Sequence, residues 1–141
     1  MIDKNVSLFN VVISHSTLDF CPFSLPINKV YPTFWFHLIK LHGTTDYYDG
    51  GEDYNSVESV IDFWINFNNT NTDPIINNIN DNGTSITSYK YENGNNNVSV
   101  EHYKIIDGGH VWFSNDFNGK NTGQLIWDFV SKYDIDGLIL D

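Results

Sequence analysis

The sequence is poor in cysteine and in basic residues. Its one cysteine, Cys21, excludes a disulfide within this chain and a zinc site built from cysteines. Seven lysine or arginine residues stand against 18 acidic residues, which gives a net charge of −11. Binding to nucleic acid or to an anionic membrane surface needs clustered basic side chains, so we expect neither partner. No apolar run approaches the ~20 residues that a membrane-spanning helix needs.

The first residues, MIDKNVSLFNVV, also lack the basic segment and the small-residue cleavage site of a secretory signal peptide. What the chain does contain is 40% hydrophobic and 16% aromatic residues, enough for a packed core. We therefore expect one domain over residues 1–141. Asparagine is frequent at 68–72, 77–83 and 93–97, and we interpret these stretches as turns and loops, because asparagine tolerates left-handed backbone.

The pattern of apolar residues predicts alternating strands and helices. A short run of apolar and aromatic side chains predicts a strand, and apolar residues three to four positions apart predict a helix. Ser56 is a suitable N-cap for the first helix, and Asn121 or Thr122 for the second. The predicted elements are strands at 8–14 and 34–41, a helix at 56–68, a strand pair at 84–91 and 98–106, and a helix at about 123–133.

Two glycine turns stand out because each follows a predicted strand and is followed along the chain by a helix. The stretch LHGTTDYYDGG, residues 41–51, presents Asp46, and the stretch KIIDGGHVWF, residues 104–113, presents His110. Parallel strands of one sheet carry such turns at the same edge. We therefore expect Asp46 and His110 to meet although they are far apart in the sequence.

An aspartate and a histidine in contact can perform acid–base chemistry. The carboxylate orients the imidazole, fixes its tautomer and stabilises the imidazolium, so the histidine can act as general base for a nucleophile. In α/β-hydrolases the chain order is nucleophile, acid, histidine. Asp46 and His110 follow the last two steps of that order.

Four motifs in sequence resemble those of the polyhydroxybutyrate depolymerase-like esterases, a family that includes feruloyl esterases. The motifs are HGTTD with a following Gly-Gly, the helix VESVIDFWINFN, the turn YKIIDGGHVW and the helix QLIWDFVSKY. The resemblance covers residues 34–133 and is weak over 1–33. It implies the C-terminal part of an α/β-hydrolase fold, a mostly parallel sheet flanked by helices.

The resemblance also implies the site. Asp46 would be the catalytic acid, His110 the catalytic base, and Trp112 a side chain of the substrate pocket. The substrate would be a small or polymeric carboxylic ester, with no metal or other cofactor, and the protein would be secreted or periplasmic. The loop after the acid is shorter than in the family, so Asp49 is an alternative acid.

The nucleophile is the main departure from the family. No Gly-x-Ser-x-Gly elbow occurs in the sequence, and Ser14 and Ser16, which precede the acid, have no flanking glycines for the sharp turn. We expect this chain to be a truncated or C-terminal portion of such an esterase that is inactive alone. The alternative is a non-catalytic module, derived from a hydrolase, that binds a ligand or a partner near Trp112.

Simpler interpretations stay open for the same residues. Asp46 could bond to local amides in its turn, and His110 could be a surface histidine. His42 would make a structural hydrogen bond and His102 would face solvent or a neighbouring strand. A zinc or iron site of His42, Asp46 and His110 has the right ligand types, but the spacing matches no local metal motif. An exposed edge strand would also allow self-association.

Overall fold

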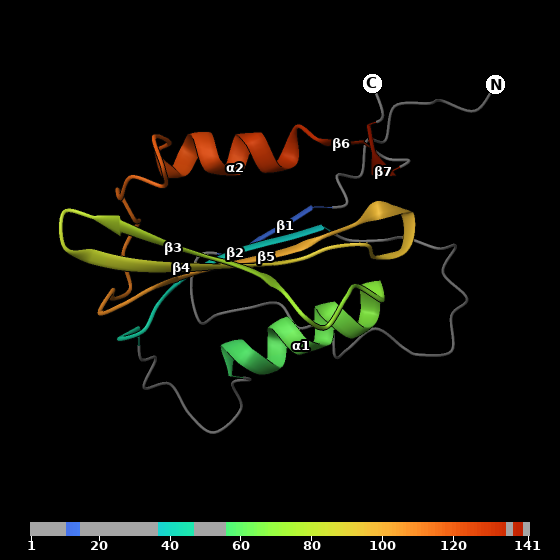
Figure 1. The fold of residues 1–141 in the computed structure, drawn as a ribbon, viewed down its shortest axis with the longest axis horizontal. Coiled ribbons are helices and arrows are strands. Elements are labelled where there is room, and N and C mark those ends of the chain that lie inside the picture. The colour runs from blue at the N-terminus through green and yellow to red at the C-terminus, as the bar shows by residue number, and fades with distance from the viewer. Residues whose placement is uncertain (1–10, 15–36, 47–55, 135–136, 140–141) are drawn as a thin grey trace.

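The computed structural model describes residues 11–14, 37–46, 56–134 and 137–139. Within these ranges five strands form one sheet in the order β1-β2-β5-β4-β3, and Figure 1 shows α1 and α2 on opposite faces of it. The elements of the sheet and its two helices are β1 (Val11–Ser14), β2 (His37–Gly43), α1 (Val57–Asn68), β3 (Ile75–Asp81), β4 (Thr84–Tyr91), β5 (Val100–Ile105) and α2 (Thr122–Val130). The remaining elements are a 3-10 turn, η1 (Asn95–Asn97), and a small antiparallel sheet of two strands, β6 (Tyr133–Asp134) and β7 (Gly137–Leu138).

The sheet is mixed, so the prediction of a mostly parallel sheet, as in part of an α/β-hydrolase, is wrong. β1 and β2, and β2 and β5, pair in parallel, whereas β4 pairs antiparallel with both β3 and β5. The error arises in the asparagine-rich stretch 77–83, because most of it is strand β3 and not a loop. Asn82 and Gly83, with φ of 49° and 93°, form the two-residue turn that joins β3 to β4.

β2 contributes apolar side chains to a core cluster on each face of the sheet. The buried Lys40 and His42 share the face of Leu38. Ile39 and Leu41 of β2 face the side of α2, and Leu38 faces the side of α1. All seven residues of β2 are buried. The α2-side cluster also contains Ile79, Ile86, Ile105, Phe113, Phe117, Leu125 and Phe129, and the α1-side cluster contains Val57, Val60, Ile61, Trp64, Ile65 and Val100.

The helix ends follow the capping residues of the sequence. The Ser56 hydroxyl accepts a hydrogen bond from the Ser59 amide, and α1 ends at Asn68 as predicted. The Asn121 side chain accepts from the Gln124 amide at the start of α2. This second helix ends at Val130, earlier than predicted, because Tyr133 already pairs with Leu138 in the small β6–β7 sheet.

The strand predicted at 8–14 is present as β1 over its described part. The strand predicted at 34–41 corresponds to β2, which runs on to Gly43, while residues 34–36 lie outside the described ranges. Residues 15–33 also lie outside them. Of the helices in the described ranges, none combines the length and the apolar character needed to cross a membrane.

Candidate active site

The turns after β2 and β5 lie side by side because these two strands are adjacent and parallel. Gly43, the last residue of β2, is in register with Ile105, the last residue of β5. The backbone then continues the pairing beyond the strands. The Thr44 amide donates to the Ile105 carbonyl at 2.9 Å, and the Thr45 amide donates to the Gly108 carbonyl at 2.9 Å. The two turns are therefore joined directly to each other.

Two glycines make this close approach feasible. A Cβ atom added to Gly43 would lie 2.2 Å from the Gly108 oxygen, closer than atoms can approach. A Cβ added to Gly108 would lie 3.1 Å from the Gly43 Cα. Because neither residue has a side chain, the two backbones come into contact, and the residues that follow them are brought together.

Asp46 and His110 meet at this junction, although 64 positions separate them. The Asp46 Oδ1 atom lies 3.0 Å from the His110 Nδ1 atom. The Asp46 side chain is 2% exposed, whereas that of His110 is 60% exposed. A carboxylate can only accept, so in a neutral imidazole bonded to it the Nδ1 atom carries the proton and Nε2 keeps its lone pair. The pair therefore places a buried carboxylate against an exposed imidazole.

The structure thus brings together the acid and the histidine that the sequence singled out. The Asp46 amide donates to the Gly43 carbonyl at 3.0 Å, which closes the turn and leaves the carboxylate directed to His110. Asp49, the alternative acid, lies outside the described residues, as does Ser16. Ser14 ends β1 in register with Lys40 of β2.

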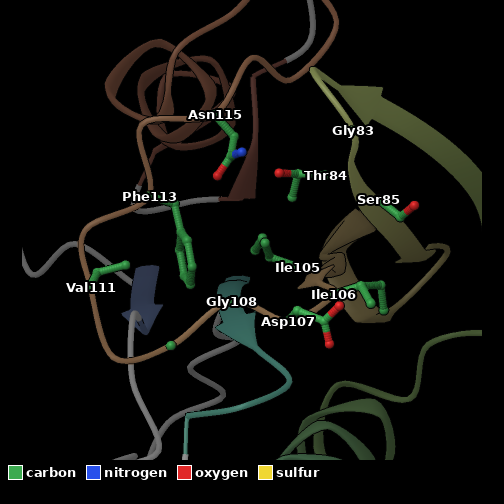
Figure 2. Close-up of a pocket in the computed structure, with 11 residues that line it drawn as sticks. Gly83, Thr84, Ser85, Ile105, Ile106, Asp107, Gly108, Val111, Phe113 and Asn115 are labelled. Atoms are coloured by element: carbon green, nitrogen blue, oxygen red, sulfur yellow. The ribbon is translucent and has the colours of Figure 1, made fainter.

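A pocket of about 450 Å³ lies beside the histidine turn, and Figure 2 shows its lining. Phe113 and Ile105 supply apolar surface at its centre, while Thr84 and Asn115 supply polar groups. The turn itself contributes Asp107, Gly108, Gly109 and Val111. Trp112 is not among the lining residues, and its side chain is 61% exposed.

Three other histidines are buried in the sheet. The rings of His42 and His102, on neighbouring strands, lie 6.0 Å apart, and His102 also stacks on Tyr89 of β4 at 5.7 Å. Burial, followed by the charges of His42 and two lysines, lowers the pKa of His102 to about 3. Burial also lowers the pKa of His37 to about 4, and that of His42 below its ordinary value.

The surroundings of His102 and His42 differ in part from what the sequence predicts. His102 faces its cross-strand neighbour Tyr89, as one alternative held, and it does not face solvent. A structural hydrogen bond was predicted for His42. Its Nδ1 atom has no hydrogen-bond partner in the described structure. Within the described ranges, no cluster of three or more histidine, cysteine or acidic side chains is arranged to hold a metal ion.

The sequence analysis missed Thr44 and Thr45, whose hydroxyl groups also join the two turns. The Thr45 hydroxyl donates to the Gly108 carbonyl at 2.7 Å, and the Thr44 hydroxyl accepts from the Asp107 amide at 2.8 Å. Both threonines stand in the HGTTD motif, immediately before the acid. Their place between glycine and aspartate was the available signal, but their partners lie in the other turn.

Comparison of the sequence with family models and with curated proteins finds no match.

Proposed function

We propose that Asp46 and His110 are the acid and the base of a carboxylic ester hydrolase of the polyhydroxybutyrate depolymerase or feruloyl esterase type. The observation that carries this proposal is the 3.0 Å contact between a buried carboxylate and the Nδ1 atom of an exposed histidine. The order of the four sequence motifs supports the same activity. The mixed sheet does not oppose it, because acid–histidine pairs with this role occur on unrelated folds.

In the proposed reaction His110 Nε2 takes the proton from a serine hydroxyl as that oxygen attacks the ester carbonyl. Asp46 stabilises the imidazolium, which then gives its proton to the leaving alcohol, and water releases the acyl group by the same two steps. The sequence supplies the acid and the base but no Gly-x-Ser-x-Gly elbow. The proposed role of this chain is therefore the proton-transfer half of the site.

Hydrolysis of p-nitrophenyl acetate by the purified chain tests the assignment. An activated ester also reacts with an accessible imidazole, so we expect slow turnover even without a serine nucleophile. His110→Gln should abolish this turnover, and Asp46→Asn should lower it at least about tenfold. Asp73→Asn removes an exposed carboxylate outside both turns and outside the pocket, and is the matched control. Turnover that is equal in all four proteins would disprove the assignment.

Labelling with a fluorophosphonate, followed by intact mass measurement, shows whether a serine of this chain or His110 is the nucleophile. A mass shift of one phosphonyl group means that a serine of this chain reacts, and the labelled residue is then found by peptide mapping. Turnover without labelling means that His110 reacts directly, as expected if the serine elbow is missing.

The second candidate is a non-catalytic ligand-binding module, and the pocket beside the histidine turn favours it. Its volume of about 450 Å³ is within the range of small-molecule sites, and its mostly polar lining also includes the apolar side chains of Ile105 and Phe113. Calorimetric titration with a phenolic ester distinguishes this candidate. Saturable binding that Asn115→Ala weakens, in a chain without turnover, supports the module, and absence of binding counts against it.

A further inference from the structure

We propose that Thr45 is a positioning residue for His110. Its hydroxyl group holds the turn after β5 at the separation at which the imidazole reaches Asp46. This inference rests on the proposed function, because it concerns the same acid–histidine pair. It adds a residue whose contribution acts through the backbone and not through contact with a substrate.

The Gly108 carbonyl carries the geometric argument. It accepts two hydrogen bonds from one residue, from the Thr45 amide at 2.9 Å and from the Thr45 hydroxyl at 2.7 Å. Thr45 immediately precedes Asp46, and Gly108 lies two positions before His110. The Gly108 carbonyl, which accepts two hydrogen bonds, therefore sets the separation of the two turns close to both the acid and the base.

Thr44 holds an earlier part of the same turn in a complementary way. Its hydroxyl accepts from the Asp107 amide at 2.8 Å, while its own amide donates to the Ile105 carbonyl at 2.9 Å. Two successive hydroxyl groups thus bind an amide and a carbonyl of the other turn, one as acceptor and one as donor. This arrangement fixes both the separation and the orientation of the histidine turn.

The magnitudes separate positioning from stability. Thr45 is exposed, and one hydrogen bond of this kind is a small part of the stability of a domain, so its loss leaves the domain folded. The contact between Asp46 and His110 is more sensitive. At 3.0 Å it is near the normal hydrogen-bond length, and a displacement of about 1 Å breaks it.

The test is the tautomer of the neutral His110 ring, measured from imidazole ¹⁵N chemical shifts in the full chain. Thr45→Val keeps the side-chain shape without the hydroxyl group, and we expect it to lower the Nδ1-protonated fraction at least about twofold. Thr45→Ser restores the hydroxyl group and should restore the native fraction. Thr87→Val is the matched control, because it removes a hydroxyl bond of 3.2 Å to Asn78 elsewhere in the sheet.

Each outcome has one meaning. A native tautomer fraction in Thr45→Val overturns the positioning role, and so does an equal change in Thr87→Val. Asp46→Asn must shift the fraction as well, and if it does not, the acid–histidine pair fails and the proposed function fails with it. If Asp46→Asn shifts the fraction and Thr45→Val does not, only the role of Thr45 is wrong.

Discussion

Acidification should destabilise this fold through its buried histidines. His102 and His37 are almost fully buried, and burial lowers their pKa values from 6.5 to about 3 and about 4. In the unfolded chain both rings take up a proton as the pH falls through 6.5. In the folded chain they stay neutral until much lower pH, so the unfolded state binds more protons. The free energy of unfolding therefore decreases as the pH is lowered.

The size of the effect follows from the same values. Each histidine that is protonated only in the unfolded state removes about 1.4 kcal/mol per pH unit. Between pH 7 and about pH 4.5 this amounts to about 2–3 kcal/mol for His102, and to nearly the same for His37. The sum of about 5 kcal/mol equals the whole stability of a weakly stable domain. We therefore expect the protein to unfold, or nearly so, by about pH 4.5.

Denaturant unfolding followed by circular dichroism at a series of pH values measures this directly. His102→Leu removes one titrating ring at similar volume. The free energy of unfolding of this variant should therefore fall by about 2–3 kcal/mol less than that of the native chain over the same pH range. Val100→Ala is the control, since it destabilises the same strand and face without removing a titrating group. Equal pH dependence in the native chain and in His102→Leu would refute the reasoning.

Three further predictions concern packing and the sheet edge. Gly43→Ala should lower the free energy of denaturant unfolding by about 2 kcal/mol, because its Cβ atom would overlap the facing turn. Gly109→Ala should be tolerated, because the nearest atom to its Cβ atom would lie 4.0 Å away. In thermal or denaturant unfolding, Phe129→Ala should cost about 3–5 kcal/mol, and the exposed Trp127→Ala less than about 0.5 kcal/mol. The exposed edge strand β3 should allow weak self-association, so Ile76→Lys should lower the average mass in light scattering; a native chain that is monomeric at every concentration contradicts this.

The sequence predicted the parts of this molecule that local patterns determine. Ser56 and Asn121 cap their helices because short polar side chains bond to free amides nearby in the chain. The approach of Asp46 to His110 could also be predicted, because each follows an apolar strand and a glycine turn. That inference needed only the parallel pairing of β2 with β5, which the structure contains.

The sequence analysis failed where a local signal was misjudged or where partners are distant. The Asn82-Gly83 pair is a strong hairpin signal, but the surrounding asparagines led to a loop prediction and so to the wrong sheet. The isoleucines of β3 stand among asparagines and do not alternate regularly, and the strand is paired along its length by β4. The bonds of Thr44 and Thr45 reach across 63 positions, and no local pattern records such contacts.

The insertion of α1, β3 and β4 between two neighbouring strands has a consequence for folding order. The β3–β4 hairpin closes a two-residue turn and can form within microseconds, whereas β2 and β5 must close a loop of more than 50 residues. The junction that carries Asp46 and His110 should thus assemble late in folding. Pulse-labelling by hydrogen exchange should therefore detect protected amides in the hairpin before those of Thr44 and Thr45.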